Sequence, residues 1–276
     1  MRIIDLSVTI RHEDAKELER VRIKYINHRK GANLLGLASC FLPDEKFTRK
    51  LKNSFLYIFG LRKITYRDFP DTLGLAWERL SISTHCGTHL DAPYHYGPYC
   101  ASSLALRIDN IPLDYCFSDG VLLDFRHKNE SGLITAGDIK NELQRIGYRI
   151  KPKDIVLIMT GTDKKSNEGD YPFNYPSLDR QSIEWLVAAG VKIIGTDTWG
   201  MDRPVHLMAR DFFRTKNKDT LWPIHCLGRE KEYFQIEKLA NLDQINRPFG
   251  FKIACFPIKI KDASAGWVRV VAIFAD

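Results

Sequence analysis

Three of the eight histidines of this chain fall within eleven residues, and this cluster constrains the fold more than any other feature. The segment contains His85, His89 and His95, with Asp91 between the last two. Burying several neutral imidazoles and a carboxylate together costs free energy unless each polar group is paired. A metal ion satisfies them jointly, because imidazole nitrogen and carboxylate oxygen are suitable ligands for zinc, manganese or iron. The cluster therefore predicts a metal site.

The residues between the histidines indicate how the backbone brings them together. We expect a strand that ends near Ser83 and runs through His85 to give way at Gly87. The turn at residues 91–93 contains a proline, which stiffens the backbone before His95. A turn of this kind can point several side chains at one spot.

The same residue types also occur in enzymes that use a nucleophilic side chain. A Ser-His-Asp triad would need a nucleophilic serine, and the chain contains no Gly-x-Ser-x-Gly motif. Cys86 and Cys100 lie near the histidines, so a Cys-His nucleophile is an alternative. Most buried cysteines behave as small hydrophobic residues, which favours the metal site over this alternative.

Short runs of β-branched residues alternate with helical periodicity, which is typical of an α/β protein. The chain has 276 residues and no long polar or Gly/Ser-rich linker, so we expect one compact domain over residues 1–276. The predicted strands are residues 3–8, 77–83, 120–124, 154–159, 191–195, 251–256 and 267–274. Predicted helices span residues 135–146, opened by the capping residues Thr135 and Asp138, and residues 179–189, ended by Gly190.

A third helix, over residues 47–59, is predicted to be amphipathic. Its apolar residues are Phe47, Leu51, Phe55, Ile58 and Phe59. Three interpretations stay open: a helix packed on the sheet, a subunit contact or lid over the site, and a membrane-surface helix. The last is least favoured, because the helix is isolated and only moderately basic.

Charge and composition exclude several other classes of protein. The net charge is +7, but Lys and Arg are scattered among acidic residues, which argues against nucleic-acid binding. No apolar run approaches the roughly 20 residues that span a bilayer. Residues 3–6 predict a strand and not a signal peptide, and the six cysteines form no Cys-x-x-Cys pair. These features predict a soluble, cytoplasmic protein.

Residues 85–95 resemble the His-x-Gly-Thr-His-x-Asp-x-Pro-x-His signature of the cyclase family, which includes kynurenine formamidase and isatin hydrolase. The resemblance predicts a second half, a His followed twelve residues later by a Glu that shortly precedes Leu-x-Asn-Leu. His225 and Glu237 fit this pattern. Residues 4–6, 160–161, 195–197 and 264–269 also resemble family landmarks, so the likeness covers nearly the whole chain apart from residues 20–65.

The resemblance implies a ligand set. His85, His89 and Asp91 would hold one metal, and Asp91 would bridge to a second that is also held by His225 and Glu237. Some relatives work with a single metal, so the resemblance implies one or two divalent ions, zinc or manganese. His95 would be the proton donor and acceptor.

The resemblance also implies a fold and an assembly. The fold would be an α/β domain of the swivelling β/β/α kind, with a mixed, strongly curved sheet flanked by helices. The assembly would be a homodimer or homotetramer, in which segments of one subunit reach toward the site of the next. The helix over residues 47–59 is the candidate for that contact.

On this basis we expect a metal-dependent hydrolase that acts on a carbon–nitrogen bond other than a peptide bond, as an arylformamidase does, or on a cyclic imide or lactone. Hydroxide generated on the metal would attack the carbonyl group of a small-molecule substrate, and His95 would carry protons. The alternative is a metal-dependent cyclase or dehydratase that acts on a biosynthetic intermediate. A metal-binding protein without turnover is disfavoured, because it needs no proton carrier beside a complete ligand set.

The identity of the substrate stays open. Residues 198–202 are bulkier than the small-residue turn expected of the formamidases. Trp199, Tyr94 and Tyr96 either line an aromatic substrate pocket or pack beside the site.

Three more polar residues have two interpretations each. Asp202 and His206 either support the ligands or, in the favoured interpretation, have surface or loop roles. Arg269, within an apolar terminal strand, suggests a buried ion pair with a structural role.

Overall fold

The computed structural model describes residues 1–14, 17, 19–38, 46–165 and 169–275. Contacts divide the chain into two compact units, one formed by Met1–Arg20 and Ser83–Asp276 and the other by Val21–Ile82. The single domain expected over residues 1–276 stays a prediction. Among the described helices, none is long and apolar enough to cross a membrane.

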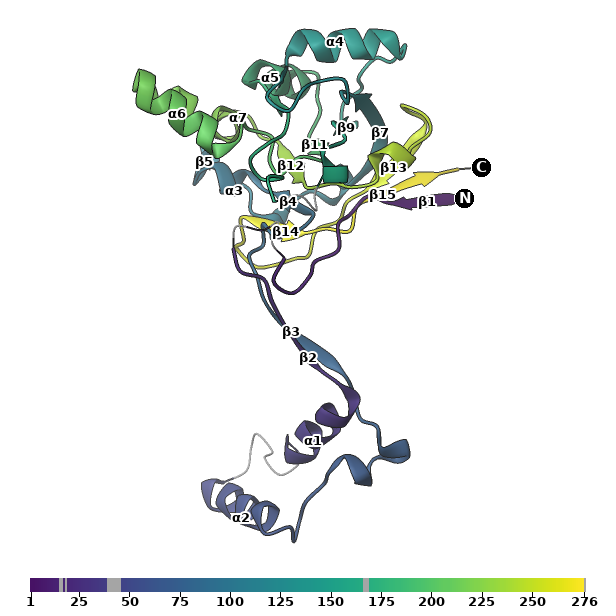
Figure 1. The fold of residues 1–276 in the computed structure, drawn as a ribbon, viewed down its shortest axis with the longest axis vertical. Coiled ribbons are helices and arrows are strands. Elements are labelled where there is room, and N and C mark those ends of the chain that lie inside the picture. The colour runs from purple at the N-terminus through teal and green to yellow at the C-terminus, as the bar shows by residue number, and fades with distance from the viewer. Residues whose placement is uncertain (15–16, 18, 39–45, 166–168, 276) are drawn as a thin grey trace. The chain divides into compact units, whose positions relative to one another are not determined.

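Within the described residues, the larger unit is built on a mixed, strongly curled sheet of nine strands (Figure 1). These strands are β1 (Arg2–Asp5), β4 (His89–Asp91), β7 (Phe117–Asp124), β9 (Ile155–Met159), β11 (Ile193–Thr196), β12 (Phe234–Glu237), β13 (Phe251–Ala254), β14 (Ala265–Trp267) and β15 (Val271–Phe274). They follow the order β1-β15-β13-β7-β9-β11-β12-β4-β14. The central strands β7, β9, β11 and β12 pair in parallel, and the strands on both sides pair antiparallel. The α/β class with a mixed, curved sheet is confirmed.

Helices cover one face of this sheet. The helices of the larger unit are α3 (Pro93–Tyr96), α4 (Ala136–Arg145), α5 (Arg180–Ala188), α6 (Val205–Thr215) and α7 (Pro223–Leu227). Successive residues of a strand face opposite sides, so Val121 and Leu123 of β7 pack in one core with α4 and α5, while Leu122 packs in the other core. Strand β9 and residues 120–123 of β7 are buried on both faces, which is why Ile155–Met159 and Val121 to Leu123 read as continuous apolar runs.

Short strands complete this unit. They are β5 (Tyr99–Cys100), β6 (Ser103–Leu104), β8 (Leu133–Ile134) and β10 (Ser177–Leu178). β5 pairs antiparallel with β6, and β8 pairs parallel with β10.

The prediction that a strand runs through His85 is wrong. Strand β3 (Trp77–Ser81) belongs to the smaller unit, and His85 lies in a turn before β4. Gly87 has a φ of +65°, a left-handed conformation in which a strand cannot continue. Strand β4 consists of His-Leu-Asp, without a β-branched residue, so pairing with β12 and β14 defines it and local propensity does not.

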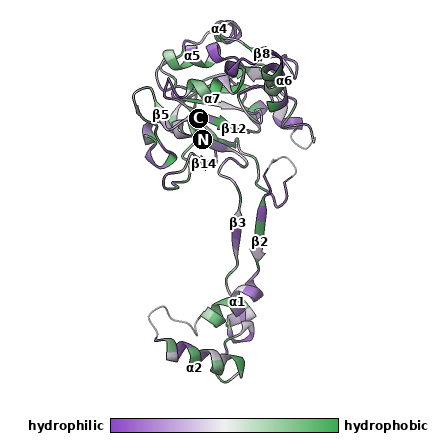
Figure 2. Ribbon diagram, turned by 90° about the vertical axis from the view of Figure 1, so that its left-hand side faces the viewer, coloured by the Kyte–Doolittle hydropathy of each residue, from purple (hydrophilic) through white to green (hydrophobic). Residues whose placement is uncertain are grey.

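The smaller unit contains β2 (Arg22–Ile26), which pairs antiparallel with β3, and the helices α1 (His28–Ala38) and α2 (Phe47–Ile58). The helix predicted over residues 47–59 is thus confirmed. Figure 2 shows hydrophobic and hydrophilic residues alternating along α2, as an amphipathic helix requires. Its apolar side chains are exposed in this unit, at 78% for Phe47 and 75% for Ile58. The surface that covers them stays a prediction.

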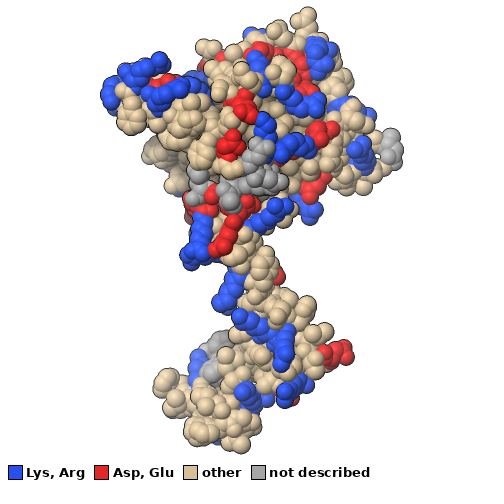
Figure 3. Space-filling view, viewed as in Figure 1, with Lys and Arg blue, Asp and Glu red and all other residues tan. Residues whose placement is uncertain are grey.

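Charged side chains are spread over the surface in mixed signs. On the face drawn in Figure 3, Lys and Arg lie scattered, with Asp and Glu among them on the larger unit. Arg269 is part of this pattern: it pairs with Asp5 at 2.9 Å, and its side chain is 80% exposed. The buried ion pair expected for Arg269 is wrong, because the terminal strand begins only at Val271 and Arg269 lies in the loop before it.

The two helices predicted in the larger unit are confirmed together with their first residues. Thr135 accepts a hydrogen bond from the Asp138 N–H, and the Asp138 carboxylate accepts one from the Thr135 N–H, which is a capping box. Asp179 caps α5 by accepting the Ser182 N–H at 2.7 Å.

Removing the cap at Thr135 should weaken the larger unit. We expect Thr135→Ala to lower the free energy of unfolding by about 1 kcal/mol, because the Asp138 N–H loses its acceptor. Urea unfolding would measure the change. The control is Gln144→Ala, at an exposed position of the same helix; an equal loss in both variants would contradict a specific role for the cap.

Candidate metal centre

The pairing of β4 with β12 brings three candidate ligands together. His89 and Asp91 share one face of β4, because residues two apart in a strand point the same way. Glu237 lies directly opposite His89 in the antiparallel register. Leu90 and Ile236 point to the other side and are fully buried in the core. The sheet itself therefore presents one imidazole and two carboxylates at one place.

The distances among these groups are those of ligands around a common point. His89 Nε2 lies 3.3 Å from Asp91 Oδ1 and 3.6 Å from Glu237 Oε2. His85 Nδ1 lies 2.9 Å from Asp91 Oδ1. Among the described residues, His85, Asp91 and His95 can offer ligand atoms within 4.8 Å of one another, and so can His89, Asp91 and Glu237. Asp91 belongs to both groups.

Several of these atoms are buried and have no hydrogen-bond partner in the described part of the chain. They are His89 Nε2, both carboxylate oxygens of Asp91, and Glu237 Oε1. Unpaired buried polar atoms are costly, and a divalent cation would satisfy all of them at once. The donor set therefore fits a metal ion.

Hydrogen bonds on the far side of the rings orient two of the imidazoles. His89 Nδ1 donates to the Gly87 carbonyl at 2.8 Å; a carbonyl only accepts, so Nε2 carries the lone pair that a metal needs. His85 Nε2 bonds Ser264 Oγ at 3.2 Å, which leaves Nδ1 toward Asp91.

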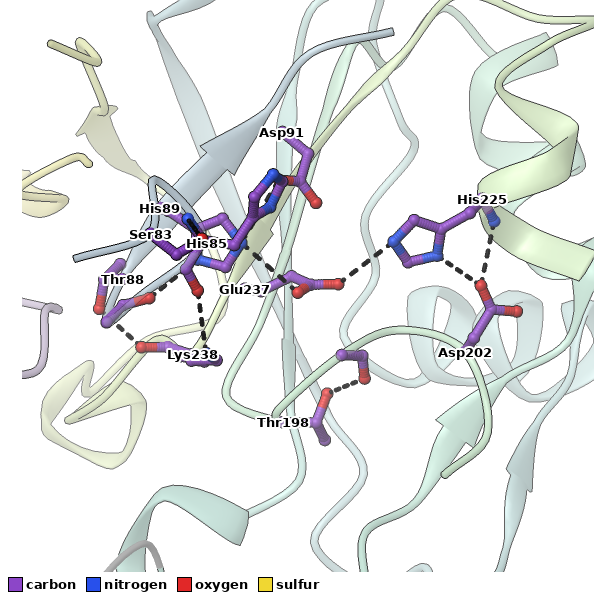
Figure 4. Close-up of polar contacts among 12 residues, drawn as sticks. Ser83, His85, Thr88, His89, Asp91, Thr198, Asp202, His225, Glu237 and Lys238 are labelled. Atoms are coloured by element: carbon purple, nitrogen blue, oxygen red, sulfur yellow. Dashed lines mark hydrogen bonds and ion pairs between the residues drawn. The ribbon is translucent and has the colours of Figure 1, made fainter. Parts of the chain in front are cut away.

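His225 is oriented in the same way from helix α7. Its Nδ1 bonds Asp202 Oδ2 at 2.6 Å, and its Nε2 lies 3.9 Å from Glu237 Oε1. Figure 4 shows Glu237 between His89 and His225. Asp202 also accepts the N–H groups of Ile224 and His225, which ties it to the first turn of α7. Asp202 lies in the loop before α6, but its side chain is buried and bonded to His225, so the structure agrees with the other interpretation, in which Asp202 supports a ligand.

His95 lies on α3 beside the ligand groups. The centroid of its ring is 4.2 Å from that of His85 and 5.3 Å from that of His225. Although His95 exposes more surface than its neighbours, desolvation of the ring among the other imidazoles lowers its pKa to about 4, against the opposing charge of Asp91.

The electrostatics of the metal-free site favour a protonated His225. Burial lowers the pKa of His225, but the hydrogen bond and charge of Asp202, together with Glu237 and Asp91, outweigh it and raise the pKa to about 9. Burial and the charge of Asp91 raise the pKa of Glu237. In the metal-free protein, a protonated His225 supplies the positive charge beside the carboxylates that a bound cation would supply.

A cavity of about 170 Å³ opens onto these groups. Its lining includes His85, His95, His225, Glu237, Trp199 and Trp222. Of the three aromatic residues considered from the sequence, Trp199 lines this cavity. Tyr96 is buried and stacks on Tyr233 at 5.4 Å, and Tyr94 lies against the Arg107 guanidinium at 4.4 Å. Nothing in the sequence predicted that Trp222 lines the cavity, because the residues around it form no recognisable motif.

The nearby thiols do not resemble activated nucleophiles. Burial, together with the charge of Glu17, raises the pKa of Cys86 to about 12, and burial also raises the pKa of Cys100. A nucleophilic cysteine needs a lowered pKa, so the Cys-His alternative is disfavoured. His206 is exposed, as the favoured interpretation of this residue expects.

Comparison with family models identifies the family. The model described as "Putative cyclase" matches residues 4–203, which is more than half of the chain. The chain belongs to the cyclase family. The match includes His85, His89, Asp91 and Asp202 but ends before His225 and Glu237, so β12 and α7 bring these two residues to the site in the structure itself.

Relatives and solved structures agree with this family. The chain is 25% identical over 194 residues to a kynurenine formamidase of Erythrobacter litoralis, covering 70% of this chain and 74% of the relative. It is 24% identical over 210 residues to an isatin hydrolase of Roseibium aggregatum, covering 72% and 74%. The structure of isatin hydrolase A from Ralstonia solanacearum superposes with a TM-score of 0.70 at 21% identity, covering 99% of this chain and 92% of that one. The fold is therefore that of isatin hydrolase.

The charge on His225 should depend on Asp202. We expect Asp202→Asn to lower the pKa of His225 in the metal-free protein, because the charge-assisted hydrogen bond becomes a neutral one and the negative charge beside the ring is lost. Titration of the imidazole by NMR would measure this shift. Asp211→Asn, which removes a carboxylate that pairs with Arg203, is the control; equal shifts in both variants would contradict this account.

The same shift gives the metal-free protein a pH-dependent stability. The folded pKa of His225, about 9, lies above the ordinary value of 6.5. Its contribution is therefore fully present below pH 6.5 and is lost as the pH rises through about 9. Asp202→Asn should reduce that loss in urea unfolding across this range.

Proposed function

We propose that the protein is a metal-dependent hydrolase of an amide, a cyclic imide or a lactone, with arylformamidase-like activity. The observation that carries the proposal is Asp91: it is fully buried, the ring nitrogens of His85 and His89 lie 2.9 and 3.3 Å from its Oδ1, and it belongs to both groups of candidate ligands. A carboxylate in that position suits a bridge between two cations. The alternative, a cyclase or dehydratase, becomes the outcome if the test below fails on every hydrolysable substrate.

We assign the ligand set that the family resemblance implies; the residues differ in their grouping from the two groups of close ligand atoms, which share Asp91. His85, His89 and Asp91 would hold one zinc or manganese ion, and Asp91, His225 and Glu237 would hold a second where two are bound. Supporting this, Gly87, Ser264 and Asp202 orient the three imidazoles by hydrogen bonds. A bound divalent metal would lower the pKa of a water molecule toward neutrality and polarise a carbonyl group.

His95 is proposed as the proton donor and acceptor. Its ring makes no hydrogen bond to any described residue and lines the cavity between His85 and His225. A nitrogen of this ring can therefore take a proton from the attacking water and return it to the leaving nitrogen or oxygen. His95 is exposed at the cavity side of the ligand groups, and this position suits proton transfer to and from a substrate.

The cavity walls support an aromatic substrate. Trp199 and Trp222 offer flat apolar surfaces on which an aryl ring can stack. Two solved relatives bind small aromatic ligands, an isatin hydrolase with thioisatinate and isatin hydrolase A of Labrenzia aggregata with benzyl benzoate. We infer that a small aryl amide or cyclic aryl amide is the substrate class.

The proposed activity can be tested with metal-stripped protein. We expect no hydrolysis of N-formylkynurenine, isatin or a small panel of lactones and imides until zinc or manganese is restored. Asp91→Ala should abolish turnover and metal binding together, because it removes the carboxylate shared by both ligand groups. Tight metal binding without turnover on any substrate would contradict the hydrolase and favour the cyclase.

A second variant separates proton transfer from metal binding. His95→Gln should lower kcat by roughly 10²- to 10⁴-fold and leave the affinity for zinc nearly unchanged, since His95 is assigned no ligand role. Steady-state kinetics and chelator competition would measure the two quantities. If the variant lost affinity for zinc as well as kcat, His95 would be a metal ligand. Its ligand atom lies close enough to those of His85 and Asp91 for that role.

We further propose that the protein forms a homodimer or homotetramer through α2. The support is the exposed apolar face of this helix, which includes Phe55 at 57% and Leu51 at 63% exposure.

Phe55→Asp should place a charge in that contact and shift a sizing profile toward smaller species. Thr48→Asp, at an exposed polar position of the same helix, is the matched control and should leave the profile unchanged. An unchanged profile in both variants would contradict the contact.

A further inference from the structure

A buried ion pair lies against the turn that carries the first candidate ligand. Lys238 follows Glu237 at the end of β12, and its side chain is 5% exposed. Its Nζ donates to Glu17 Oε2 at 2.6 Å and to the main-chain carbonyl of His85 at 3.0 Å. Burying an ammonium group is costly unless it is paired and hydrogen-bonded, and here both conditions hold.

Glu17 binds the same turn from its other oxygen. Glu17 Oε1 accepts the Gly87 N–H at 2.7 Å, and the Glu17 side chain is 10% exposed. The ion pair thus contacts the residue before Cys86 and the residue after it. Gly87 is also the residue whose carbonyl orients His89, so both His85 and His89 depend on the geometry of this turn.

The main chain of Lys238 adds a further contact to the turn. Its carbonyl accepts the Thr88 hydroxyl at 2.6 Å, and Figure 4 shows this bond beside the contact with His85. Lys238 has a φ of +58°, a left-handed conformation that is strained for a residue with a side chain. Strain at this position persists because the contacts on both sides of Lys238 determine its conformation.

Lys238 also lines two cavities. It lines the cavity of the candidate site, and it lines a cavity of about 300 Å³ together with Arg11, Glu17 and Cys86. Its Nζ lies 5.0 Å from the centroid of the Trp199 ring.

We infer that Glu17 and Lys238 are positioning residues that fix the His85–Gly87 turn and thereby set the affinity of the site for its metal. The inference rests on the proposed function, since it presupposes the metal site. Glu17 lies more than sixty residues before the ligands, so through this carboxylate the N-terminal segment contacts the turn that carries His85.

The test compares metal affinity in Lys238→Met, Glu17→Gln and the double variant. Zinc affinity would be measured by chelator competition, and the visible spectrum of the cobalt-loaded protein would report ligand geometry. We expect each single variant to bind zinc about 10- to 100-fold more weakly, as loss of a group that orients ligands does. The fold-loss of zinc affinity in the double variant should be smaller than the product of the fold-losses in the two single variants, because both residues act as one pair.

Two design choices separate positioning from simple destabilisation. Glu17→Gln is nearly isosteric and keeps an oxygen for the Gly87 N–H, so it carries the test if Lys238→Met fails to fold. It also leaves Trp199 untouched. The control is Lys192→Met with Glu232→Gln, which removes an ion pair of 3.3 Å away from the turn and should change neither zinc affinity nor the cobalt spectrum.

The outcomes distinguish this inference from the proposed function. Zinc affinity and cobalt spectrum unchanged in folded Glu17→Gln, with wild-type protein that binds zinc, would overturn the inference and leave the metal site standing. Variants that lose thermal stability with unchanged affinity would also overturn it. Wild-type protein that binds no metal would overturn the proposed function and this inference together.

Discussion

The candidate site depends on the antiparallel pairing of β4 with β12. This register sets Glu237 opposite His89, and the two-residue period of the strand adds Asp91 on the same face. A shift of one residue would turn these side chains into the core and expose Leu90 and Ile236. Because both are fully buried in the larger core, hydrophobic packing fixes the register that the polar groups need.

Three further histidines reach this face from separate elements. His85 comes from the turn before β4, His95 from α3 and His225 from α7. The imidazoles of His85, His89 and His225 are each held by a hydrogen bond on one nitrogen, so the other is directed at the shared carboxylates. Burying these polar groups without a metal costs folding free energy, which the apolar packing of the sheet beneath them offsets. A bound cation would remove that cost.

The sequence allowed the residues of the site to be predicted better than the elements that carry them. The histidine cluster and its family resemblance predicted His85, His89, Asp91, His225 and Glu237, which the structure brings into one region. The strands β4 and β12 were missed. β4 is His-Leu-Asp and has little intrinsic β-propensity, so it forms by pairing, and β12, although Phe234 and Ile236 favour a strand, is only four residues long. The apolar runs of β7 and β9 and the capped helices α4 and α5 were predicted because burial and capping leave local signals. Glu17 and Lys238 contact each other across more than two hundred residues of sequence, and no local pattern predicts such a contact; Asp202 was a candidate, but its bond to His225 is also long-range.

The central claim is that residues from β4, β12, α7 and the preceding turn hold a metal. The most direct measurement is a crystal of the protein loaded with zinc or manganese, with diffraction data collected above and below the absorption edge of that metal. The account predicts an anomalous peak within coordination distance of His85, His89 and Asp91, with a second peak beside His225 and Glu237 if two ions bind. A fully loaded crystal with no peak at these residues, or with a peak elsewhere, would contradict it.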